Sequence, residues 1–82
     1  MFKIMIHSEA LKELKKLHPA FQYAVTELAR KLTRGHIPPE HDIRKVSGIE
    51  STYYVRIGKY GVFYYVDLMN GKIYILHIRK II

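Results

Sequence analysis

The chain has 82 residues, 49% of them hydrophobic, and carries 14 Lys and Arg against 7 Asp and Glu, a net charge of +7. This length suits a single domain over residues 1–82, and the absence of Cys excludes disulfides and thiolate metal sites. No stretch reaches the roughly 20 apolar residues that span a bilayer, and the apolar start is too short for a signal peptide, so we expect a cytoplasmic protein. The charge favours a polyanionic partner such as nucleic acid or a ribonucleoprotein, although an acidic protein or a basic surface that only aids solubility would also explain it.

The first part of the chain predicts one strand and two helices. Residues 2–7 predict a strand, because Phe2, Ile4 and Ile6 alternate with Lys3, Met5 and His7. Ser8 is the expected N-cap of a helix over about residues 9–17, which has an apolar stripe. Pro19 suits the first turn of a second amphipathic helix, and Gly35 is expected to supply its left-handed cap.

Residues 35–42 hold two Pro, two His and two acidic residues and are predicted to form a loop. His36, Glu40, His41 and Asp42 have metal-ligating atoms, but their spacing matches no known ligand pattern. We therefore expect no metal site and no cofactor.

The second half of the chain predicts three antiparallel strands. Residues 43–48 start extended and then turn. Residues 53–67 alternate with period two on either side of Gly58-Lys59, which is the pattern of a β-hairpin with a two-residue turn. Asn70-Gly71 predicts a second tight turn, and a last strand starts at Ile73.

These elements predict an α+β fold of the order β-α-α-β-β-β. Two N-terminal helices pack on one face of a small, mostly antiparallel four-stranded sheet, and the other face is left open. The side chains expected toward the helices are Val55, Ile57, Tyr60, Val62, Tyr64, Val66, Leu76 and Ile78. Those expected on the open face are Tyr54, Arg56, Phe63, Tyr65, Ile75, His77 and Arg79.

The predicted open face combines aromatic rings with guanidinium groups, which suits single-stranded RNA. Aromatic rings stack on unpaired bases, worth roughly 1–3 kcal/mol each, and Arg offers a bidentate fork for a phosphate. Cleavage at a ribose needs a group that takes the 2′-hydroxyl proton, a cation for the phosphorane, and an acid for the leaving oxygen. His77 is the candidate base or acid and Arg56 and Arg79 the candidate charge stabilisers, whereas a lone His on a strand is more often structural.

A protein partner is the alternative occupant of the same face. Exposed apolar patches of several hundred Å² usually mark interfaces, and Phe63, Tyr65, Ile73 and Ile75 would form one. Both readings hold together if the partner covers the RNA site.

Several segments, taken in order, resemble the RelE/ParE superfamily of toxins from type II toxin-antitoxin systems. Residues 8–17 are similar to that family's first helix, and residues 44–48 to its Lys-Leu-x-Gly turn. The hairpin over residues 53–64 is similar to its signature Tyr-Arg-Val-Arg-Val-Gly-Asp-Tyr-Arg-Val-Ile-Tyr, and residues 73–78 fit its last core strand. The resemblance covers nearly the whole chain and implies the fold described above in a small toxin held by a cognate antitoxin, in a heterotetramer as one arrangement.

Within RelE-like members the resemblance implies metal-independent cleavage of mRNA in the ribosomal A site, whereas ParE-like members inhibit DNA gyrase. Arg56 matches the second basic position of the signature, but Tyr54 stands at the first, and Gly61 stands where an Arg is expected. Residues 79–82 read Arg-Lys-Ile-Ile where many members continue with Gly-His-Arg and a Tyr.

A ribosome-dependent mRNA endoribonuclease is therefore the leading interpretation, with no membrane partner. A catalytically silent binding or regulatory protein and a gyrase inhibitor are the alternatives. The candidate RNA-binding residues are Tyr54, Lys45, Arg44, Lys59, Lys80 and Tyr65, and the candidate antitoxin contacts are Phe63, Tyr65 and Ile75.

Overall fold

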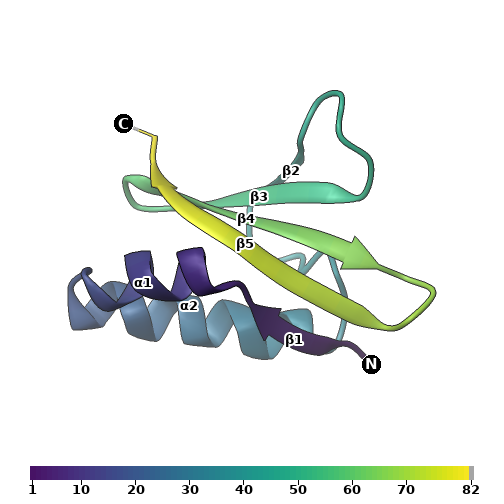
Figure 1. The fold of residues 1–82 in the computed structure, drawn as a ribbon, viewed down its shortest axis with the longest axis horizontal. Helices are drawn as coiled ribbons and strands as arrows, with labels where there is room; N and C mark the ends of the chain where they lie inside the picture. The colour runs from purple at the N-terminus through teal and green to yellow at the C-terminus, as the bar shows by residue number, and fades with distance from the viewer. Residues whose placement is uncertain (82) are drawn as a thin grey trace.

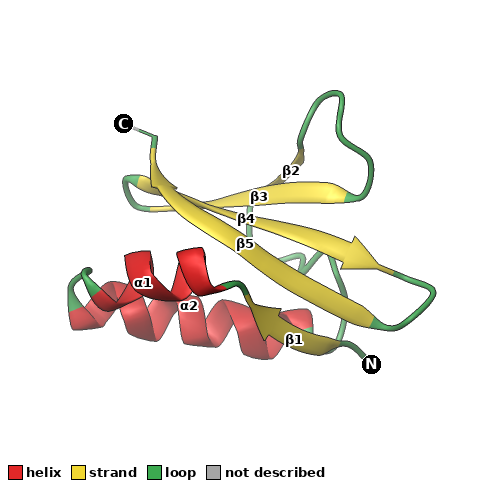
Figure 2. Cartoon of the chain, viewed as in Figure 1, coloured by secondary structure: helices red, strands yellow, loops and turns green. Residues whose placement is uncertain are grey.

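The computed structural model describes residues 1–81, in which two helices lie against one face of a five-stranded sheet (Figures 1 and 2). The elements are β1 (Lys3–Ile6), α1 (Ser8–Lys15), α2 (Pro19–Leu32), β2 (Ile43–Lys45), β3 (Thr52–Ile57), β4 (Tyr60–Asp67) and β5 (Lys72–Lys80). The predicted α+β class is confirmed, with one strand more than expected. That strand is β2, whose three residues pair with β3.

The strand order in the sheet is β1-β5-β4-β3-β2. β1 runs parallel to β5 and every other pair is antiparallel, so the sheet is mostly antiparallel as predicted. Figure 1 shows α1 and α2 below the sheet, while the upper face of β3, β4 and β5 has no helix over it. We call this upper face the open face.

The two predicted turns have different outcomes. Ile57 pairs with Tyr60 across the two-residue turn, and Gly58 has a φ of 59°, a conformation that favours glycine, so this hairpin is confirmed. The tight Asn70-Gly71 turn is wrong, because Asp67 pairs with Lys72 and four residues form the loop. The Asp67 carboxylate accepts hydrogen bonds from the Asn70 backbone N–H at 3.2 Å and side-chain Nδ2 at 2.8 Å, which holds the wider loop.

Histidines cap both helices at their N-termini, and for α1 the capping residue differs from the predicted one. His7 precedes α1 and its Nδ1 accepts the Glu9 N–H at 3.1 Å, so the predicted Ser8 cap is wrong. His18 caps α2 in the same way, accepting the Ala20 N–H at 3.0 Å. The predicted left-handed cap at Gly35 is also wrong, since α2 ends at a right-handed Thr33.

The core lies between the helices and the sheet. Its buried side chains are Ala10, Val25, Leu28, Leu32, Val55, Val62, Tyr64, Val66, Ile73, Ile75 and Ile78. The Tyr64 hydroxyl donates to the His36 carbonyl oxygen at 2.7 Å. This hydrogen bond ties the loop after α2 to the centre of the sheet.

A β-bulge changes which residues of β5 face the core. Phe63 pairs with His77 but the next residue, Tyr64, pairs with Ile75, so Leu76 is an extra residue in β5. Ile75 is therefore fully buried, and its predicted place on the open face is wrong. Leu76, predicted to face the helices, instead lines a cavity on the open face with His77.

Candidate functional site

Three aromatic side chains form one row across the open face. Tyr54 of β3 pairs with Phe63 of β4, which pairs with His77 of β5. The rings of Tyr54 and Phe63 are stacked, with centroids 5.3 Å apart, and those of Phe63 and His77 are 4.7 Å apart. We call these three residues the aromatic row, and it offers aromatic surface on which a base can stack.

Basic side chains lie beside the aromatic row, toward the β3–β4 turn. Gly61 pairs with Arg56 on one side and with Arg79 on the other. The Arg56 Nε donates to the Gly58 carbonyl oxygen at 3.0 Å, which holds its guanidinium near the turn that contains Lys59. We call Arg56, Lys59 and Arg79 the basic rim.

The basic rim is not neutralised by acidic side chains in the described residues 1–81. Among residues 1–81, the ion pairs join Lys16 to Glu13, Arg30 to Glu27 and Arg44 to Asp42. No acidic side chain of this part of the chain forms an ion pair with the rim. Its cations are therefore available to a polyanion.

A cavity of about 250 Å³ opens at His77. It is lined by Val46, Ile49, Thr52, Phe63, Leu76, His77 and Arg79, so the β2–β3 loop forms one of its walls. Burial lowers the pKa of His77, and the neighbouring Arg79 guanidinium lowers it further. A neutral imidazole at pH 7 is able to accept a proton, as a general base must.

Two other predicted RNA-binding residues, Arg44 and Tyr65, lie on the open face but outside the aromatic row and the basic rim. Arg44 pairs with Tyr54 and so lies on the open face, at the edge of the sheet and in an ion pair with Asp42 at 3.7 Å. Tyr65 lies in a different row of the face, beside Tyr74. It is 39% exposed, as a partner contact requires.

Two predicted RNA-binding lysines are not brought to the open face. Lys45 pairs with Tyr53, whose ring packs against the buried Tyr64. Lys80 pairs with Tyr60, whose ring packs against Phe21 of α2. Because directly paired residues share a face of the sheet, both lysines lie on the helix side, although both are exposed.

Three further residues that line the cavity at His77, namely Val46, Ile49 and Leu76, are hard to predict from the sequence. Val46 and Ile49 flank the Ser47-Gly48 turn, and two apolar residues in a predicted turn are a weak sign of a loop that packs. Leu76 lines the cavity because the bulge turns it to the open face. The sequence cannot predict this bulge, because nearly all of residues 73–78 are apolar and show no alternation.

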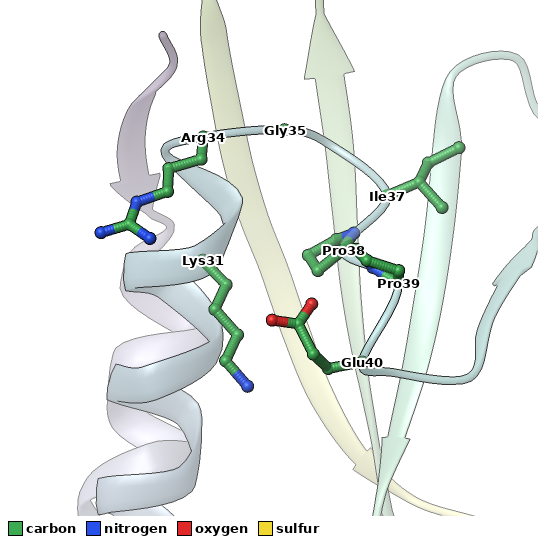
Figure 3. Close-up of a pocket in the computed structure, with 7 residues that line it drawn as sticks. All are labelled: Lys31, Arg34, Gly35, Ile37, Pro38, Pro39 and Glu40. Atoms are coloured by element: carbon green, nitrogen blue, oxygen red, sulfur yellow. The ribbon is translucent and has the colours of Figure 1, made fainter.

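A second hollow lies between the end of α2 and the loop that follows it (Figure 3). Its lining residues are Lys31, Arg34, Gly35, Ile37, Pro38, Pro39 and Glu40. Figure 3 shows the Glu40 carboxylate directed toward α2 and the Arg34 guanidinium directed away from the hollow. The lining combines one acidic residue, two basic residues and two prolines, and it lacks the aromatic rings of the open face.

The His and acidic side chains of residues 36–42 are not part of any group of three candidate metal ligands within residues 1–81. His36 packs between the rings of Phe2 and Tyr53, with centroids 5.8 and 6.0 Å away. Within residues 1–81 no three His, Asp or Glu side chains are grouped as metal ligands. In the same part of the chain, neither helix has the length and apolar character needed to cross a membrane.

Comparison with known proteins agrees with the fold and the resemblance. Residues 4–80 match the model of the ParE toxin of type II toxin-antitoxin systems. The chain is 42% identical over 81 residues to RelE1 of Methanocaldococcus jannaschii, itself a predicted toxin, and the alignment covers 98% of this chain and 87% of that protein.

Two solved structures show the same architecture. A chain of the archaeal RelE-RelB complex from Pyrococcus horikoshii superposes with a TM-score of 0.87 and 26% identity, covering 98% of this chain and 94% of that one. A chain of the intact E. coli RelBE toxin-antitoxin complex superposes with a TM-score of 0.82 and 16% identity, covering 98% and 96%. The second similarity shows the fold alone.

Proposed function

Because this chain belongs to the ParE toxin family of type II toxin-antitoxin systems, we propose that it is the toxin of such a pair and cleaves mRNA on the ribosome. The cleavage site is the open face of the sheet. The observation that carries this proposal is the aromatic row placed directly beside the basic rim. One part binds bases and the other binds phosphates.

The proposed reaction is attack of a ribose 2′-oxygen on the adjacent phosphorus. His77 takes the 2′-hydroxyl proton as the new P–O2′ bond forms, and its lowered pKa keeps it in the neutral form that can do so. Arg79, its neighbour on the same strand, stabilises the charge on the phosphorane. The P–O5′ bond then breaks, and the leaving 5′-oxygen takes a proton from water or from protonated His77. The products are a 2′,3′-cyclic phosphate and a free 5′-hydroxyl.

The direct test is cleavage of an mRNA on purified ribosomes. We expect Arg79→Ala to slow cleavage by about 10²–10³-fold, the usual effect of removing one charge-stabilising donor. Arg56→Ala is also expected to slow it. Lys12→Ala removes an exposed cation from α1, on the other side of the molecule, and serves as the matched control. Equal effects of Arg79→Ala and Lys12→Ala on the cleavage rate would show that the cleavage site does not lie on the open face.

An antitoxin is the proposed protein partner. The open face exposes Tyr65 and leaves Leu76 and Phe63 only partly covered, so it retains apolar surface for a partner. The similar solved structures include RelE-RelB and RelBE complexes, which supports the same kind of assembly here. Co-expression with the product of the neighbouring reading frame tests this. Restored growth and co-purification are expected, and they should weaken when Tyr65 is replaced by Asp.

A catalytically silent binding protein is the second candidate, favoured by one observation. Gly61 stands between Arg56 and Arg79, so the rim lacks a cation at its centre. Unchanged growth on expression alone, with no cleavage on ribosomes, would support this candidate. A DNA supercoiling assay with purified gyrase separates both readings from gyrase inhibition.

A further inference from the structure

The centre of the basic rim is filled, although the residue there has no side chain. Gly61 is itself buried, and its cover comes from two neighbours on the open face. A Cβ atom at position 61 would lie 3.2 Å from Phe63 Cε1 and 3.4 Å from Ile81 Cγ2. The Ile81 Cδ1 would lie at 3.5 Å. The contact with Phe63 is tight and those with Ile81 are ordinary van der Waals contacts, so a longer side chain at position 61 would have Phe63 and Ile81 as its immediate neighbours.

Ile81 is held in this place by the backbone. Its N–H donates to the Lys59 carbonyl oxygen at 2.8 Å, which extends the pairing of the last strand with the β3–β4 turn beyond Lys80. Since side chains alternate along an extended chain, Ile81 falls on the same face as Arg79. Its side chain covers Gly61 and is 41% exposed, so it also presents apolar surface to the outside.

We propose that Ile81 is a specificity-determining residue that closes the centre of the basic rim, so that RNA meets an apolar side chain between two guanidiniums instead of a third guanidinium. This inference rests on the proposed role of the open face in binding RNA. An apolar side chain cannot hydrogen-bond a phosphate, so phosphate contacts at this row fall to Arg56 and Arg79 alone. The surface between them is left for a base or a sugar.

The consequence is that positions 61 and 81 act as a pair. Because Ile81 already contacts the Cβ position of residue 61, we expect a long side chain there to reach the open face more readily when residue 81 is small. Gly61→Arg alone should therefore bring little new affinity for RNA. Gly61→Arg together with Ile81→Gly should place a third guanidinium between Arg56 and Arg79.

Binding of a single-stranded RNA oligonucleotide, followed by fluorescence anisotropy across a range of salt concentrations, tests this coupling. One added phosphate contact steepens the log–log dependence of affinity on salt by about 0.7 for a single strand. We expect this change, with an affinity gain of about tenfold, in the double variant but not in Gly61→Arg or Ile81→Gly alone. Leu68→Arg adds the same charge on the exposed loop at the other end of the sheet and should be indifferent to residue 81. An equal gain from Gly61→Arg in both backgrounds overturns the proposal.

A second measurement needs no RNA and separates this inference from the proposed function. Gly61→Val places methyl groups beside Phe63 and Ile81. The contact with Phe63 is present in both backgrounds, so the variant should lower the melting temperature in both, and by more when residue 81 is Ile than when it is Gly. An equal loss in both backgrounds overturns the proposal. A further outcome is that the wild type and all the variants bind no RNA although the effect of Gly61→Val on the melting temperature still depends on residue 81. That result would overturn the RNA-binding function and the specificity role of Ile81, and would leave only the packing of Ile81 over Gly61.

Discussion

Removing one oxygen atom from the core, with Tyr64→Phe, should destabilise the protein measurably. Tyr64 is fully buried, its ring stacks on Tyr53 with centroids 5.6 Å apart, and its hydroxyl donates to the His36 carbonyl at 2.7 Å. Phe keeps the buried ring but leaves that carbonyl without the donor. An unsatisfied buried acceptor costs roughly 1–3 kcal/mol, and because this hydrogen bond is only partly buried we expect the lower part of that range. A loss of 1 kcal/mol shifts the melting temperature of a domain this small by about 4–8 °C.

The assay is thermal and urea unfolding followed by circular dichroism. We expect Tyr64→Phe to lose about 1–2 kcal/mol and to melt roughly 5–15 °C lower. Tyr23→Phe is the matched control, because Tyr23 is 67% exposed on α2 and its replacement should cost less than 0.5 kcal/mol. A Tyr64→Phe protein that unfolds with the control would mean that the hydroxyl does not tie the loop to the sheet.

Tyr64 should also make the stability of the protein depend on pH in the alkaline range. Burial raises the pKa of the Tyr64 hydroxyl in the folded protein, and the nearby Tyr53 raises it further. The unfolded chain therefore loses this proton first, near the ordinary value of about 10. The stabilising contribution is complete below that pH and is lost as the pH rises above it. Tyr64→Phe should flatten this part of the stability profile, and an unchanged profile would refute the assignment.

Three further predictions follow from the geometry. Burial and Arg79 lower the pKa of His77, so the unfolded chain takes up this proton before the folded chain as the pH falls through about 6.5. The wild type should therefore be less stable at pH 5 than at pH 8 in urea unfolding. This difference in the free energy of unfolding should be smaller for His77→Gln. His7→Ala and His18→Ala each remove a helix cap and should cost about 0.5–2 kcal/mol, adding in the double variant because they cap different helices; a non-additive loss in urea unfolding would contradict separate caps. Ile75→Ala should cost roughly 2–5 kcal/mol and Leu76→Ala clearly less, and the reverse order in the same assay would contradict the bulge.

The sequence predicts the hairpin well because period, turn and apolar pattern all agree there. Val55 and Val62 face the core as expected, and Gly58 makes the turn. The short strand β2 is beyond such reasoning, since three residues cannot show a period. The cap of α1 is missed because Ser is among the preferred cap residues, and only the folded chain shows that His7 reaches the free N–H of Glu9.

The site is predicted in part. Arg56, His77 and Arg79 do share the open face with Tyr54 and Phe63, because the strand register follows from the hairpin. The charge of Lys45 and Lys80 predicts contact with RNA, whereas their pairing with Tyr53 and Tyr60 puts both on the helix side of the sheet. The cover of Gly61 by Ile81 joins residues 20 positions apart, so no local pattern reveals it.

The bulge in β5 explains how one strand serves both the core and the site. Residues 73, 75, 77 and 79 would share one face of a regular strand, yet Ile73 and Ile75 are fully buried while Arg79 is exposed. In a regular strand, burying the two isoleucines would turn the Arg79 guanidinium toward the helices, and an unpaired buried charge is too costly to keep. Exposing His77 and Arg79 would instead remove two isoleucines from the core. The extra residue Leu76 resolves this conflict, because the strand changes face after Ile75 and presents His77 and Arg79 beside Phe63. The same irregularity that misleads a period-two reading of β5 is therefore what assembles the open-face site.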